Sequence, residues 1–311
     1  MVLNMKEIDK LIKRLDIWLA KSDNLKNRSE EKLIAYSNMP VRKFSNLASE
    51  KAANYIRIPS SISMDNLGLW YAGCGAKSLL KNEADFSKFF GVSAGYLYLS
   101  FITQSTAFER GGVERCSILR DWAAAVYFLL ASCEPSNEFE KIAELIKKLN
   151  DGGNLKDLGS KVAIFCIALI EVERSGIDGA IQKIAVNRSS LKDSNGALDV
   201  YQKMIEKYSD KTSPEEYFDL VCAALDIHVK EAIQIENDME FFDFLWEPWG
   251  VVPCEVIGYV NMVRRKFGIQ IEFPDTKLGD ICRSLKFQLP SIQYDGLADS
   301  VRRRAEQVLL S

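Results

Sequence analysis

The residues best suited to chemistry lie in one stretch, positions 231–250, where acidic and aromatic side chains alternate without any lysine or arginine. Carboxylates at such close spacing repel one another and cost stability unless positive charge offsets them. That charge comes from elsewhere in the fold or from a basic partner. The acids are Glu231, Glu236, Asp238, Glu240, Asp243 and Glu247, and the large apolar residues are Met239, Phe241, Phe242, Phe244, Leu245, Trp246 and Trp249.

We predict that this stretch forms a partner-binding surface, because charge accelerates encounter with a basic protein while aromatic anchors dominate affinity. The alternative is an amphipathic helix over 214–240 that runs into a turn, with the aromatic residues in the core and the acids facing water. In the first interpretation the partner-binding residues are Glu236, Asp238, Glu240, Asp243, Trp246, Glu247 and Trp249.

The chain contains one histidine, His228, at the edge of an apolar helical stripe with Glu231 three residues later. We expect it to be partly buried with a local hydrogen bond rather than to bind metal. Zinc sites of the HExxH type and di-iron bundles each need two histidines, so these classes are excluded. A nucleophilic triad would have to recruit this same histidine. We therefore predict no catalytic residues, no metal and no cofactor.

Other polar groups have structural interpretations. The glycines of 73–78 favour a tight helix contact over a phosphate loop, and the charged run 108–122 favours a loop with local ion pairs over an anion pocket. Glu171 and Glu173 stand two apart, hence on different helix faces, which does not favour paired acid–base work. The three arginines 302–304 are expected to form a solvated face.

Composition limits the class of protein. The balance of 40 Lys and Arg against 43 Asp and Glu gives a net charge of −3, which argues against a general affinity for nucleic acid, although a local basic patch stays possible. The N-terminal residues are interrupted by charges every few positions, so neither a signal peptide nor a membrane span is expected. The seven cysteines are scattered and mostly embedded in apolar segments, which predicts reduced core thiols and a cytoplasmic setting.

Helical spacing of apolar residues dominates the chain and predicts an all-α protein, either an irregular multi-helix bundle or a superhelical array of helical hairpins. The glycine-rich segment 150–160 suggests an N-terminal helical half, 1–150, and a C-terminal half, 151–311, with one continuous domain as the alternative. Short runs at 96–102 and 267–273 have β character, and we expect the first to be buried helix and the second an extended piece. Helices are predicted over 4–21, 29–56, 64–83, 84–107, 113–132, 137–149, 157–175, 193–208, 214–235 and 253–267.

Residues 246–249, Trp-Glu-Pro-Trp, followed by the helix 253–267 and the closing segment 267–275, resemble the end region of all-α immunity proteins that protect bacteria from polymorphic and type VI secreted toxins. The resemblance covers about thirty of the 311 residues. It implies a cytoplasmic, non-enzymatic protein of bacterial competition that binds a cognate toxin and occludes its active site. The alternatives are an all-α enzyme that uses carboxylates, with Mg²⁺ as its candidate metal, and a helical scaffold.

Overall fold

The computed structural model describes residues 5–38, 61–109, 124, 126–151, 160–188, 191–234, 244, 248–287 and 290–310. Within these residues the chain is helical and contains no strand, so the predicted all-α class is confirmed. The helices are α1 (Met5–Asn38), α3 (Ser61–Leu80), α4 (Phe86–Glu109), α6 (Asn137–Asp151), α7 (Lys161–Arg188), α8 (Ala197–Ser209), α9 (Pro214–Ile233), α10 (Cys254–Phe267), α11 (Lys277–Phe287) and α12 (Gly296–Leu310).

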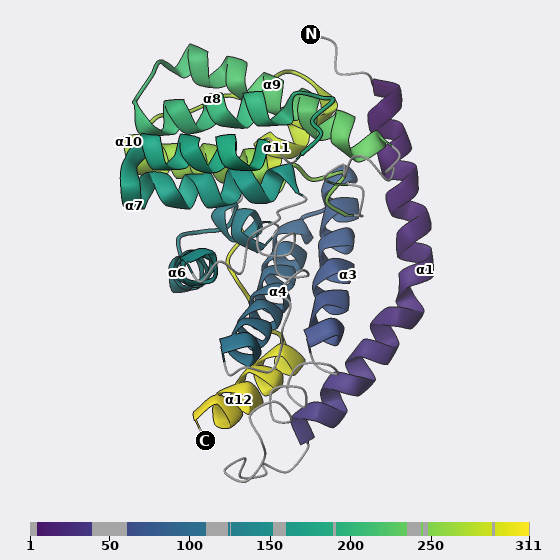
Figure 1. Cartoon of the computed structure of the whole chain (residues 1–311). Helices are drawn as coiled ribbons and strands as arrows, with labels where there is room; N and C mark the ends of the chain where they lie inside the picture. The colour runs from purple at the N-terminus through teal and green to yellow at the C-terminus, as the bar shows by residue number, and fades with distance from the viewer. Residues whose placement is uncertain are drawn as a thin grey trace.

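The helices form two groups (Figure 1). Helices α7 to α11 stack against one another, whereas α1 runs along one edge of the molecule beside α3, and α4 lies on the other side of α3. The C-terminal helix α12 packs on α1 and α4, so the end of the chain lies with the N-terminal helices. One hydrophobic cluster extends from Ile8 in α1 to Leu285 in α11 and crosses the predicted boundary at residue 150.

Helix α1 is one continuous helix where the spacing predicted separate helices over 4–21 and 29–56. Its buried seam continues past the polar middle of the helix, because Ser22 and Ser29 occupy seam positions between the buried Leu19 and Leu33. Ser22 donates to the Leu19 carbonyl oxygen at 3.0 Å, and Ser29 accepts from Asn66 of α3 at 3.2 Å. Hydrogen-bonded serines can take the place of apolar residues along a buried seam, which the apolar pattern does not reveal.

Helices α3 and α4 form a closely packed hairpin through small residues. A Cβ on Gly68 would stand 2.6 Å from Leu97, and one on Gly75 would stand 3.1 Å from Phe90. Gly73 faces the other way, toward Trp18 of α1. The predicted tight helix contact at these glycines is therefore confirmed.

An extended strap, residues 290–295, crosses α4 and leads into α12. Gly91 and Gly95 lie one helical turn apart on α4 and let the strap backbone come close: a Cβ on either would stand 2.2 Å from a strap carbonyl oxygen, that of Ser291 or of Gln293. The Gln293 amide donates to the Gly91 carbonyl oxygen at 2.9 Å. The strap ends at Asp295, which caps α12 by accepting from the Ala298 amide at 2.8 Å.

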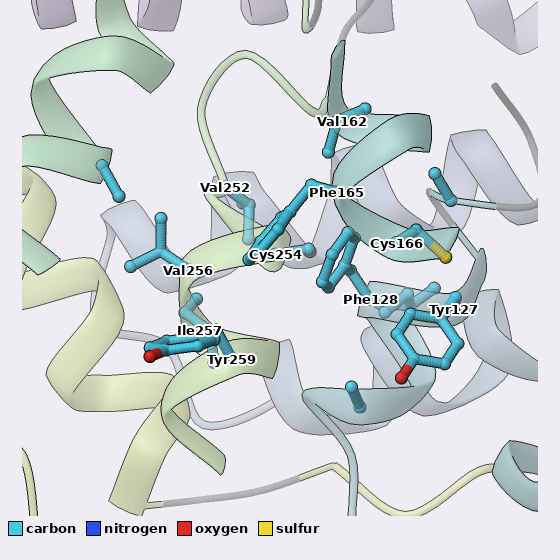
Figure 2. Close-up of a cluster of buried hydrophobic side chains, with 14 of the residues drawn as sticks. Tyr127, Phe128, Val162, Phe165, Cys166, Val252, Cys254, Val256, Ile257 and Tyr259 are labelled. Atoms are coloured by element: carbon cyan, nitrogen blue, oxygen red, sulfur yellow. The ribbon is translucent and has the colours of Figure 1, made fainter. Parts of the chain in front are cut away.

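The larger core lies among α7, α8, α10 and the helical residues 126–131 (Figure 2). Phe165 stands between two aromatic rings, that of Tyr201 at a centroid distance of 4.5 Å and that of Phe128 at 5.3 Å. Tyr259 packs nearby, and its hydroxyl donates to the Met204 carbonyl oxygen at 2.8 Å. A hydroxyl bonded in this way adds aromatic area to the core without leaving a polar atom unsatisfied.

Helix ends agree with the capping chemistry of the sequence. Ser213 accepts from the Glu216 amide at 3.2 Å and Pro214 follows it, so the predicted start of α9 is confirmed. Ser136 caps α6 in the same way, accepting from the Phe139 amide at 3.3 Å. Helix α10 ends at Phe267 and is followed by Gly268, whose φ of 70° is the left-handed conformation that glycine adopts at low cost.

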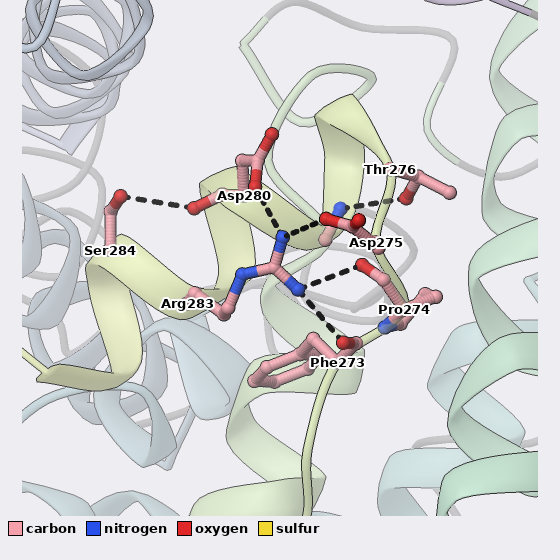
Figure 3. A network of polar contacts seen from close by, with 8 residues as sticks. Phe273, Pro274, Asp275, Thr276, Asp280, Arg283 and Ser284 are labelled. Carbon is pink, nitrogen blue, oxygen red and sulfur yellow. Dashed lines mark hydrogen bonds and ion pairs between the residues drawn. The ribbon is translucent and has the colours of Figure 1, made fainter.

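The predicted extended piece after α10 is present, and 96–102 is buried helix within α4 as expected. Ile269, Ile271 and Phe273 are buried while the residues between them are exposed, the alternation of an extended chain. Arg283 of α11 fixes the end of this piece (Figure 3): its guanidinium donates to the carbonyl oxygens of Phe273 at 2.9 Å and Pro274 at 3.0 Å. It also pairs with the carboxylates of Asp275 and Asp280.

Candidate functional site

Of the seven predicted partner-binding residues, the structure describes one, Trp249. Glu236, Asp238, Glu240, Asp243, Trp246 and Glu247 lie outside the described residues. Trp249 is 8% exposed and belongs to the core, so it is not an exposed anchor as predicted, and we remove it from the binding surface. Its indole lies in the turn 248–252, whose residues are buried together, and a large ring in such a turn gains more by burial than by exposure.

The two ends of the acidic stretch lie side by side. Helix α9 ends at Ile233, and the chain is again described at Phe244 and from residue 248. A Cβ on Gly250 would stand 2.9 Å from the Phe244 carbonyl oxygen and 3.5 Å from the Ala232 Cβ. The end of α9 and the turn 248–252, which flank the acidic stretch, therefore lie against each other.

Helix α1 clamps this place. Arg14 donates from Nη1 to the Ala232 carbonyl oxygen at 2.7 Å, one of the last carbonyl groups of α9. A cation at a helix C-terminus satisfies such a group and interacts favourably with the helix dipole. Leu11, one turn earlier on α1, lies 3.6 Å from the position of a Cβ on Gly250. Both ends of the stretch are thus held against the same helix.

One of the six acids is neutralised inside the fold. Glu231 is fully buried, and its carboxylate accepts from Lys161 at 2.9 and 3.1 Å and from the side-chain amide of Asn195 at 2.8 Å. Lys161 is 1% exposed. This ion pair joins α9 to the start of α7 and to the loop before α8. A buried pair of this kind is strongly destabilising when one partner is removed, because the other charge stays buried.

His228 is fully buried, and its partner comes from another helix rather than from Glu231. Its Nδ1 lies 2.8 Å from Oε1 of Glu255, the second residue of α10, which is 2% exposed. The expected local bond is absent because Glu231 is committed to Lys161. Phe244 covers the imidazole at a centroid distance of 4.4 Å and itself has a φ of 65°, which is strained for a bulky residue.

The buried polar cluster is formed by Lys161, Asn195, His228, Glu231 and Glu255. It joins α7 and α10 to the last turns of α9, just before the acidic stretch. Two buried polar atoms in it, Nε2 of His228 and Oε2 of Glu255, have no hydrogen-bond partner in the described part of the chain. The described residues contain no group of three histidine, cysteine or acidic side chains that could hold a metal ion. The cluster consists of one ion pair, Lys161–Glu231, and one hydrogen-bonded pair, His228–Glu255, and both join helices to one another.

Lys161, Asn195 and Glu255 are not among the residues predicted from the sequence, because their partners are distant in the chain. Lys161 carried one signal: it opens an apolar helical run, 162–170, that leaves it no polar face. A lysine at the start of a helix that has no solvent-exposed face is expected to pair with a buried carboxylate. No comparable signal marks Glu255, whose acidic first-turn position suits the helix dipole in any setting.

A GxSxG motif occurs at residues 91–95, Gly-Val-Ser-Ala-Gly, so the expectation that the chain has no nucleophile motif of this kind is wrong. In hydrolases this motif forms a strained turn between a strand and a helix that exposes the serine. Here it lies inside α4, Ser93 is fully buried, and its hydroxyl donates to the Gly68 carbonyl oxygen at 2.7 Å. The serine is a packing residue of the α3–α4 hairpin, and the glycines seat the strap.

The paired carboxylates of α7 diverge as expected. Glu171 accepts from Ser175 one turn later, whereas Glu173 pairs with Lys266 of α10 at 2.9 Å. The charged run 108–122 and the glycine-rich segment 150–160 lie almost entirely outside the described residues.

The expectation of a fully solvated arginine face on α12 is wrong for one residue. Arg304 is 5% exposed and stands over the ring of Tyr36 at 6.0 Å, while Arg302 and Arg303 pair with Asp299. Successive residues point about 100° apart on a helix, so when α12 packs on α1 one of three consecutive arginines must face it. The guanidinium tolerates this position because it stacks on an aromatic ring.

The described cysteines are all free, and four of them, Cys133, Cys166, Cys254 and Cys282, are buried. Removal from water raises the pKa of the Cys133 thiol from 9.0 to about 12, an effect that Arg265 partly opposes. Burial likewise raises the pKa of Cys166, Cys254 and the hydroxyl of Tyr127 well above their ordinary values. These groups are inert thiols and hydroxyls at neutral pH.

This burial predicts alkaline unfolding. Above pH 9 the unfolded chain loses thiol and phenol protons that the folded chain keeps, so the unfolded state binds fewer protons and stability falls as pH rises. We expect the free energy of unfolding, measured by urea titration and circular dichroism, to decline steeply between pH 9 and 12. Tyr127→Phe removes one such group and should make the decline shallower. A stability that stays level over this interval would contradict the assignment.

Comparison of the chain with known protein families, with curated proteins and with solved structures finds no match. Among the described helices, none combines the length and the apolar character needed to cross a bilayer.

Proposed function

We propose that this chain is an all-α immunity protein of the bacterial cytoplasm, which neutralises a secreted toxin by placing the acidic stretch 235–247 over the toxin's basic active site. One observation supports the proposal above others. The two ends of the stretch meet at a base where Gly250 lies against Ala232 and α1 supplies a clamp through Arg14. A segment fixed at both ends loses less conformational entropy on binding than a free tail does, so more of its contact energy appears as affinity.

The charge distribution also supports this function. Of the six acids in 231–250, Glu231 already has its countercharge in Lys161 inside the fold. The other five, at positions 236, 238, 240, 243 and 247, carry the acidic character of the proposed surface. A cluster of this size steers a basic partner and gives association rates that fall with ionic strength.

Coexpression with the product of the neighbouring gene tests the proposal. If that product is a toxin, the wild-type chain should restore growth and form a stable complex with it. A neutralised variant, Glu236→Gln, Asp238→Asn, Glu240→Gln and Asp243→Asn, should weaken the complex by about a hundredfold or more, since each lost pair at a desolvated interface costs on the order of 1 kcal/mol.

A control changes two carboxylates of α9 that lie far from the acidic stretch. Glu215→Gln and Asp219→Asn change exposed carboxylates at the other end of α9, and they should leave affinity and protection within about threefold of wild type. Equal loss in both variants would show a general charge effect. Absence of any complex, together with absence of protection, would overturn the proposed function.

A further inference from the structure

The charges of α1 are sorted by face. Its acids Asp9, Asp16 and Asp23 recur every seven residues, which places them on one flank of the helix. Each is bound by a neighbouring helix: Lys277 of α11 pairs with Asp9 at 2.9 Å, Lys77 of α3 pairs with Asp16 at 2.8 Å, and the Trp70 indole donates to Asp23 at 3.0 Å. The acids of this flank therefore hold α1 to the fold.

Apart from Lys6, the exposed bases on the outer face of α1 have no such role. These five bases have no ion-pair or hydrogen-bond partner within the described ranges. At 100° per residue they fall within an arc of about 100°, and between the first and the last the helix rises about 33 Å. Glu31 falls inside the same arc. This basic stripe consists of Lys10, Lys13, Lys21, Arg28 and Lys32.

The stripe costs stability in the isolated chain. Lys10 and Lys13 are spaced i,i+3 and Arg28 and Lys32 are spaced i,i+4, so in each pair two like charges face each other on the helix surface. Of the acids at these spacings, Asp9 and Asp16 are committed to Lys277 and Lys77. Glu7, three residues before Lys10, and Glu31, three residues after Arg28, are left to offset the five bases. In Figure 1 no other helix lies on the side of α1 that faces away from α3.

From this arrangement we infer that the outer face of α1 is a second docking surface, which binds an acidic face of a partner protein. Ile17 decides the class of partner. It is 57% exposed and lies in the middle of the arc between Lys13 and Lys21. An exposed isoleucine ringed by charges suits an apolar pocket rimmed by carboxylates. A phosphate backbone offers no apolar surface for this isoleucine to contact. No aromatic side chain lies in the arc to stack on nucleobases.

A synthetic acidic peptide provides the probe. We choose about 28 residues of Glu- and Leu-containing heptads, which as a helix span about 42 Å and so cover the stripe. The full chain should bind the peptide with an affinity that falls as salt rises. The stripe variant, Lys10→Glu, Lys13→Glu and Lys21→Glu, should weaken binding at least tenfold or so, and Ile17→Ser should weaken it by a smaller factor.

The control changes the same net charge elsewhere. Lys88→Glu, Lys192→Glu and Lys211→Glu alter exposed lysines outside α1 and should keep peptide binding within about threefold of wild type. A second stripe variant, Lys10→Ala, Lys13→Ala and Lys21→Ala, keeps α1 helical because alanine is the best helix former. It must also lose binding, and circular dichroism checks that both variants are folded.

Two results would overturn the inference. The first is an equal loss of peptide affinity in the stripe and control variants. The second is a duplex DNA that binds the chain more tightly than the peptide does and no longer binds the stripe variant. The test is independent of the proposed function. The toxin complex depends on residues 236–243 and the peptide complex on α1, so either can fail while the other holds.

Discussion

Replacing Lys161 by methionine should destabilise the fold by about 3–5 kcal/mol, because it leaves the fully buried Glu231 carboxylate without its cation. Asn195 also donates to this carboxylate at 2.8 Å, but its neutral amide cannot replace a positive charge. The loss should appear as a shift of the urea midpoint with little change in slope, since the same surface is exposed on unfolding.

Two companion variants locate the cause of this effect. Lys161→Met combined with Glu231→Leu removes both charges and should recover most of the loss, because well-packed apolar pairs often match or exceed a buried ion pair in stability. Lys77→Met breaks the exposed pair with Asp16 and should cost less than about 1 kcal/mol. If Lys161→Met proves as mild as Lys77→Met, the pair carries no buried charge in solution.

Gly95→Ala should detach the strap from α4. The added Cβ would stand 2.2 Å from the Gln293 carbonyl oxygen, and that atom belongs to backbone that cannot rotate aside. Overpacking of this kind costs about 1–3 kcal/mol or more. Because the strap leads to Asp295, which accepts from Tyr96 at 2.8 Å and caps α12, amide hydrogen exchange should accelerate through α12 before it does in α7 or α10.

The control lies at the end of the same strap. A Cβ on Gly296, the first residue of α12, meets nothing within 4 Å, so Gly296→Ala should be neutral or stabilise the protein by about 0.4–1 kcal/mol. Protection of α12 that is the same in Gly95→Ala and in wild type would show that the strap does not hold this helix.

The buried polar cluster connects stability with the proposed function. Lys161 and Glu255 approach α9 from two different helices, and both meet it within the last turns before the acidic stretch. Phe244, within the stretch, packs on the imidazole ring of His228, which is hydrogen-bonded to Glu255. We therefore expect variants of this cluster to affect the proposed toxin binding through the base of the stretch as well as through global stability.

The sequence by itself determined the class of fold and much of its local structure. Apolar residues at helical spacing predicted the helices because each must bury one face, and Ser213 with Pro214 fixed a helix start because the capping chemistry is local. The free thiols of the described cysteines, four of which are buried, followed from their apolar surroundings in the chain. Such features depend on residues within one or two helical turns, which a single sequence displays.

The tertiary structure alone decided which polar side chains meet. Lys161 and Glu231 are seventy positions apart and His228 and Glu255 twenty-seven apart, and no local period links them. It also decided that Trp249 is buried, that Arg304 turns inward, and that the glycines of a GxSxG motif seat a strap from the other end of the chain. Burial and ion pairing depend on how helices cross, and that is set by the packing of the whole core rather than by any one segment.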